Sequence, residues 1–117
     1  MPFEDWLPSI CAAAANGSLY ISEHVKRKQL LGGRSRPSTR EINQVCSREY
    51  GVVEDCPDDS RGPEGLMWGV VSARVTHVRC TYERALPPLH TVISSYWPDT
   101  MPHKWTPDFK QRSTATV

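Results

Sequence analysis

The sequence predicts an α+β fold in which N-terminal helices pack on one face of a small antiparallel β-sheet. Apolar residues at helical spacing, with helix start and stop signals, occupy the first part of the chain. Strand-like alternation of apolar and polar residues begins at about residue 50. The length of 117 residues fits one domain. We therefore expect a single domain over residues 1–112 and a flexible C-terminal tail at 113–117.

Three segments of the first part are expected to form helices, because each has a start or stop signal and the first and third also carry an apolar side. They are residues 5–15, residues 22–31 and a segment that opens at Ser38. Asn16-Gly17 ends the first helix, and Ser22 caps the second. Ser38 and Glu41 form a capping box at the start of the third.

Four segments of the second part are expected to form strands. They are residues 51–54, 66–71, 74–83 and 91–97. The order of helices first and strands second favours an antiparallel sheet, and Pro98 stops the last strand. In the third segment, alternation places His77 and Arg79 on the same face.

The charged residues are numerous but unevenly distributed. The net charge is only +1, from 14 basic and 13 acidic residues. One segment is basic and contains Lys26, Arg27, Lys28, Arg34, Arg36 and Arg40. Another is acidic and contains Glu54, Asp55, Asp58 and Asp59. An anionic partner would therefore meet a local basic patch, because the protein as a whole is nearly neutral.

Several classes of site have no support in this sequence. The four cysteines form no CxxC pair and have no histidines at zinc spacing, which favours reduced thiols in a cytoplasmic protein. The sequence lacks a P-loop, a GxSxG elbow and an HExxH pair. We expect no metal and no cofactor. We also expect no membrane span, because the alanine run at 11–15 is too short.

The remaining histidines, arginines and tyrosines fit metal-independent cleavage of RNA, in which the ribose 2′-hydroxyl attacks the adjacent phosphorus. This reaction needs a base, an acid and cations near the phosphoryl oxygens. The candidate catalytic residues are His24, His77 and Tyr96. The candidate RNA-binding residues are Arg27, Lys28, Arg79 and Lys104.

Each candidate also has a structural interpretation. His24 would be an ordinary surface residue of a basic helix. If the face that carries His77 is covered, His77 is a hydrogen-bonded core histidine. Tyr96 would be a half-buried aromatic. Trp105, beside Lys104, could stack on a base, or it could join Phe109 in holding the C-terminal segment on the sheet.

The order of four segments is characteristic. They read SLYISEHVKRKQLLGGRSRPSTREINQVC, VVEDCPDDSRGPEGLMWGVV, THVRC and TVISSYWPDTMPHKWTPDFKQR. This order resembles the bacterial family labelled domain of unknown function 4258, over residues 18–112. The last segment is the most specific, with matches at Tyr96, Pro98, Asp99, Trp105, Asp108, Phe109 and Arg112.

The resemblance implies a fold similar to the barnase/EndoU/colicin/RelE group of ribonucleases, many of which are toxins that cut RNA without a metal. It also implies a zinc-finger antitoxin as a partner. The family's motif positions fall on His24, His77 and Tyr96, with structural roles for Asp99 and Trp105. In this chain Lys28 stands where the family's helix arginine usually does.

The leading hypothesis is a metal-independent endoribonuclease of toxin type. In it His24 or His77 acts as base and acid, Arg27 and Arg79 bind phosphate, and Tyr96 orients or stacks on the RNA. The alternative is a non-catalytic RNA-binding or protein-interaction module on the same fold, encoded by a phage.

Overall fold

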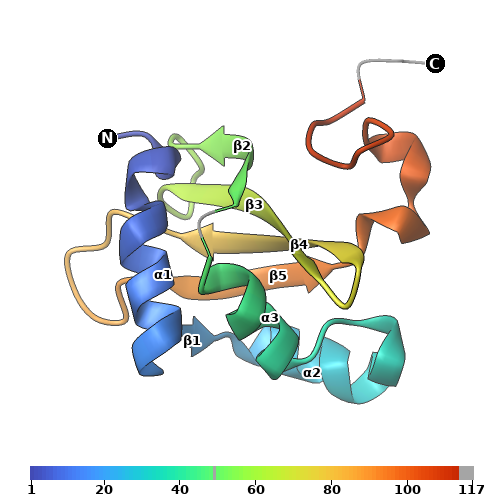
Figure 1. Ribbon diagram of the computed structural model, residues 1–117. Helices are drawn as coiled ribbons and strands as arrows, with labels where there is room; N and C mark the ends of the chain where they lie inside the picture. Colours follow the sequence, from blue (N-terminus) through green and yellow to red (C-terminus); the bar gives the residue numbers. More distant parts are fainter. Residues whose placement is uncertain (49, 114–117) are drawn as a thin grey trace.

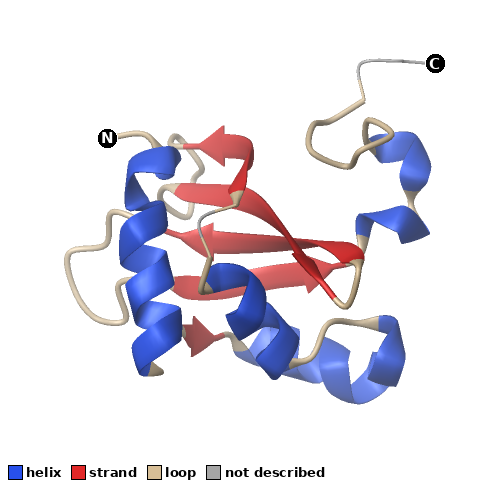
Figure 2. Ribbon diagram, viewed as in Figure 1, coloured by secondary structure: helices blue, strands red, loops and turns tan. Residues whose placement is uncertain are grey.

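The computed structural model describes residues 1–48 and 50–113 of the chain. Its three α-helices are α1 (Leu7–Asn16), α2 (Glu23–Gly32) and α3 (Thr39–Cys46). Its strands are β1 (Tyr20–Ile21), β2 (Gly51–Cys56), β3 (Glu64–Val71), β4 (Arg74–Thr81) and β5 (Thr91–Tyr96). The α+β class predicted from the sequence is therefore confirmed (Figure 2).

The sheet is mixed. Its five strands lie in the order β1-β5-β4-β3-β2 (Figure 1). Strands β2 to β5 form an antiparallel meander, as expected, but β1 runs parallel to β5 and pairs Tyr20 with Thr91. No pattern in the sequence predicts β1, because a strand of two residues shows no alternation.

The helix ends form where the local sequence predicts them. The Ser22 hydroxyl accepts a hydrogen bond from the Val25 N–H at the start of α2. The Ser38 and Glu41 capping box is present at the start of α3. Gly17 ends α1 with a φ of 79°, in the left-handed region that glycine adopts without strain.

One face of the sheet packs on α1 and α3 through apolar side chains (Figure 1). Two glycines of β3 allow this close approach. A Cβ on Gly65 would overlap the ring of Phe3, and one on Gly69 would meet the Val45 side chain. Residues 65, 67, 69 and 71 of β3 therefore face the helices, and Leu66 and Trp68 face the other side.

The segment after β5, residues 98–113, is named the C-terminal arm. It covers part of the other face, named here the open face. Lys110 lies over the ring of Trp68. The arm closes on itself through a bridge between Trp105 and Arg112 and a hydrogen bond from the Ser113 N–H to the Lys104 carbonyl.

The end of the chain and the absence of a membrane span were also predicted from the sequence. The expected flexible tail at 113–117 lies outside the described residues except for Ser113, whose backbone belongs to the arm. No helix among the described residues is long and apolar enough to cross a membrane.

Candidate active site

His77 is a buried, hydrogen-bonded histidine. Its side chain is 0% exposed and lies beneath the C-terminal arm. Nε2 donates to the Phe109 carbonyl at 2.6 Å, which leaves Nδ1 to accept from the Tyr96 hydroxyl at 3.4 Å. Burial lowers the pKa of His77 below its ordinary value of 6.5. With both nitrogens engaged and no access to solvent, His77 has the position of the hydrogen-bonded core histidine that the structural interpretation describes, and its catalytic role stays a prediction.

Tyr96 contributes to the same cluster. It pairs with His77 across β4 and β5, and its ring stacks on Trp105 with centroids 6.1 Å apart. Burial raises the pKa of the Tyr96 hydroxyl. The Trp105 ring meets His77 edge-on at 4.6 Å. Trp105 and the Phe109 backbone thus hold the arm on the sheet, as the structural interpretation expects.

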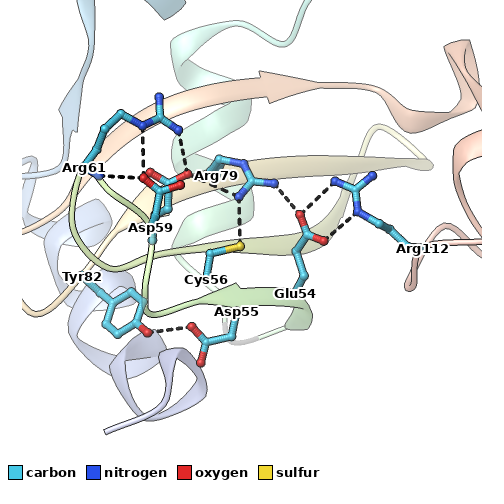
Figure 3. Close-up of polar contacts among 9 residues, drawn as sticks. Glu54, Asp55, Cys56, Asp59, Arg61, Arg79, Tyr82 and Arg112 are labelled. Atoms are coloured by element: carbon cyan, nitrogen blue, oxygen red, sulfur yellow. Dashed lines mark hydrogen bonds and ion pairs between the residues drawn. The ribbon is translucent and has the colours of Figure 1, made fainter.

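Arg79 is the centre of an ionic network on the open face (Figure 3). Its guanidinium donates to Glu54 Oε1 at 2.6 Å and to Glu64 Oε1 at 3.5 Å. Glu54 also accepts two hydrogen bonds from Arg112, at 2.8 and 3.0 Å. The hydrogen bond from Arg112, followed by that from Arg79, lowers the pKa of Glu54 despite its partial burial. The network therefore links β2, β4 and the arm.

Glu64 is the most deeply buried carboxylate of this network, at 2% exposure. Its Oε1 atom accepts from Arg61 Nη2 at 3.2 Å in addition to Arg79. Its Oε2 atom has no hydrogen-bond partner among the described residues. Arg61 itself is held by Asp59 at 3.2 Å. Two arginines from different segments are thus fixed around one buried carboxylate.

His24 of α2 lines a depression that two arginines of this network also line. This surface depression of about 500 Å³ lies between the start of α2 and the open face of the sheet. It is lined by Ser22, His24, Arg61, Arg79, Ile93 and Ser94. The His24 side chain is exposed, so it is open to a ligand. The structure therefore brings together a histidine and two arginines that are far apart in the sequence.

The other sequence candidates are placed elsewhere. Arg27, Lys28 and Lys104 are exposed, and none of them lines the depression.

Sequence reasoning gave no site role to five members of the network: Glu54, Asp59, Arg61, Glu64 and Arg112. Strand alternation does place Glu64 on the same face as Leu66, which is a usable signal. No local pattern marks Arg112, because its contact with Glu54 joins two distant segments. His90 was also missed. It is buried and donates from Nδ1 to the Thr81 carbonyl, while Ser9 contacts Nε2 at 2.7 Å.

Neither a metal site nor a known relative identifies this site. Within residues 1–48 and 50–113, no group of three or more histidine, cysteine, aspartate or glutamate side chains is placed to hold a metal ion. No family model matches the sequence, and neither a curated protein nor a solved structure matches it.

Proposed function

We propose that this chain is a metal-independent endoribonuclease of toxin type and that the depression lined by His24, Arg61 and Arg79 is its reaction centre. One observation carries the proposal: an exposed imidazole faces the same hollow as two arginines whose side chains are fixed by carboxylates. A titratable group beside oriented cations is what phosphoryl transfer requires. The same proposal includes a fold related to the barnase/EndoU/colicin/RelE group, a zinc-finger antitoxin as the partner and a cytoplasmic location.

The proposed chemistry gives each group one role. The RNA 2′-hydroxyl attacks the adjacent phosphorus, the bond to the 5′-oxygen breaks, and the products are a 2′,3′-cyclic phosphate and a 5′-hydroxyl. His24 acts as the base that takes the proton of the 2′-hydroxyl, and water gives a proton to the departing 5′-oxygen. Arg61 and Arg79 stabilise the charge on the non-bridging phosphoryl oxygens. Glu54 remains ionised, because its pKa is lowered, and it positions Arg79.

A second candidate, a non-catalytic RNA-binding or protein-interaction module, is favoured by a different observation. His77 is sealed under the arm, and Arg79 already has carboxylate partners. A phosphate group must compete with Glu54 and Glu64 for Arg79. Only one histidine then remains at the depression, whereas cleavage needs both a base and an acid.

Cleavage of RNA in EDTA separates the two candidates. We expect the purified protein to produce 2′,3′-cyclic phosphate ends and to leave DNA intact, because DNA lacks the attacking hydroxyl. His24→Ala should lower the cleavage rate by about 10²- to 10⁴-fold, the usual contribution of a general acid or base. His103→Ala is the matched control, since His103 is also an exposed histidine but lies in the arm. It should cleave like the wild type.

Two results would contradict the proposal. The first is no cleavage by pure wild-type protein together with measurable RNA binding, which is the result that the second candidate predicts. The second is equal cleavage by the wild type and His24→Ala, which would remove His24 from the reaction.

A further inference from the structure

We propose that the surface formed by α2 and the turn after it binds an acidic segment of another protein that carries apolar side chains. This surface, named here the basic leucine surface, consists of Lys26, Arg27, Lys28, Leu30, Leu31, Arg34 and Arg36. None of its residues lines the depression at His24, although His24 lies in the same helix. The inference does not depend on RNA cleavage.

Two adjacent leucines give this surface its apolar part. Leu30 is 86% exposed and Leu31 is 81% exposed, at the last turn of α2. Single exposed leucines are common on soluble proteins, but here the helix that carries them fully buries only Val25. Most of α2 is therefore open to a partner, and its end presents two large apolar side chains together.

Unpaired positive charge surrounds the two leucines. Lys26 pairs with Glu23 at 3.5 Å. Among the described residues, Arg27, Lys28, Arg34 and Arg36 have no ion-pair partner. Glu41, the one acidic residue of α3, accepts from the Ser38 N–H in the capping box. The charge of this surface is therefore left for an acidic partner to neutralise.

A hollow lies where α2 ends, lined by Gln29 and Gly33 of that end but by neither leucine. It has a volume of about 610 Å³ and opens between the turn after α2 and the hairpin that joins β3 to β4, two segments that lie near each other in Figure 1. Val71 and Trp97 supply apolar surface, and the charged side chains of Arg34, Arg36 and Glu41 line it as well. Arg74 covers the Trp97 ring at 4.2 Å and is held by Asp99. The volume is within the range of ligand pockets and accommodates an apolar side chain of a partner.

The combination favours a protein over RNA. A phosphate backbone would satisfy the arginines, but it would gain nothing from covering Leu30 and Leu31 or from filling an apolar hollow. An acidic segment with apolar side chains satisfies all of these parts: its carboxylates meet the cations, and its apolar groups cover the leucines and enter the hollow.

Binding can be measured by fluorescence anisotropy with three labelled probes. The first is a peptide of about four helical turns with glutamates on one side and leucines at helical spacing on the other. The second has every leucine replaced by serine, and the third is a single-stranded RNA. We expect the first peptide to bind most tightly. The double variant Leu30→Ser/Leu31→Ser should weaken its binding by about tenfold or more, as loss of buried anchors does.

Matched controls come from the same chain. Leu86→Ser removes a leucine that is 77% exposed but lies in the loop between β4 and β5, and Arg48→Glu reverses an exposed charge after α3. Both should leave peptide binding unchanged, whereas Arg34→Glu/Arg36→Glu should weaken it as strongly as the leucine double variant. RNA cleavage, if the wild type shows it, should be unchanged in Leu30→Ser/Leu31→Ser, which separates this inference from the proposed function.

Three results would overturn the inference. One is equal binding of the first peptide to wild type and to Leu30→Ser/Leu31→Ser, or no binding to either. Another is RNA binding that depends on these leucines when the peptide does not bind. The third is self-association of the wild type, measured by sedimentation, that Leu30→Ser/Leu31→Ser abolishes, because the occupant would then be a second copy of this chain.

Discussion

The face of the sheet that α1 and α3 cover is lined by apolar side chains, whereas the open face carries a histidine, a tyrosine and a chain of arginines and carboxylates. On the helix face, Ile10, Ile42 and Val45 are fully buried. On the open face, the arm is held by the hydrogen bond from His77 to Phe109 and by the ion pair of Arg112 with Glu54. The same five strands thus support two different kinds of interface.

The difference separates stability from chemistry. Apolar packing is non-directional and does not respond to pH. Because the burial of apolar surface is the dominant favourable term in folding, we expect the helix face to set most of the free energy of unfolding. Hydrogen bonds and ion pairs depend on geometry and on protonation. The open face is therefore where pH, salt and a bound phosphate can act, and the proposed reaction centre lies at its edge.

The largest expected effect is on the helix face. Ile42→Ala should lower the free energy of unfolding by about 2–5 kcal/mol, because it removes buried methyl groups and leaves a cavity. Urea denaturation measures it. Leu30→Ala is the matched control and should change stability by no more than about 0.5 kcal/mol, since Leu30 is exposed. Similar losses in the two variants would show that the helix face is not the main source of stability.

A smaller effect is expected in the ionic network. Arg79→Met should lower the free energy of unfolding by about 1–3 kcal/mol, because Glu64 is buried and loses a donor. Combining it with Glu64→Gln should restore part of this loss, since the amide carries no charge. Arg27→Met, at an exposed cation of α2, is the control. If the effects of Arg79→Met and Glu64→Gln simply add, Arg79 does not stabilise the Glu64 charge.

The smallest effect is a pH dependence under the arm. The pKa of folded His77 lies below its unfolded value, so its contribution to stability is fully present above about pH 6.5 and is lost as the pH falls through the folded pKa. Between pH 6.5 and 5 the wild type should lose at most about 1.4 kcal/mol per pH unit from this residue. His77→Gln keeps a donor for Phe109 but does not titrate, and its profile should be flatter.

Urea denaturation at several pH values measures this difference. Glu54, whose pKa is lowered by Arg112 and Arg79, is present in both proteins, so its titration contributes equally to the two profiles. Parallel pH profiles for the wild type and His77→Gln would contradict the burial of a neutral imidazole.

The sequence predicted those parts of the fold that have a local cause. The caps at Ser22 and Ser38 and the alternation in β4 each follow from neighbouring residues. The parallel β1 was missed, because two residues show no period. The position of the arm could not be predicted either, since its contacts with His77 and Glu54 join distant segments and have no local pattern.

The candidate site was predicted only in part, for a similar reason. Alternation correctly placed His77 and Arg79 on one face, but it could not decide whether that face was open or covered at each residue. The arm covers His77 and leaves Arg79 at a depression with His24. That convergence depends on how α2 packs beside β5, which the parallel pairing of β1 with β5 fixes.

The pairing of Tyr20 with Thr91 also has a consequence for the order in which the chain folds. Contacts between residues that are far apart in sequence form late, because closing the intervening loop costs entropy before any bond is made. During synthesis, α1 and α2 leave the ribosome well before β5 exists. The apolar sides of the N-terminal helices therefore stay uncovered until most of the chain has been made. We expect the hairpin of β3 and β4 to form first, because its two strands are adjacent in the sequence.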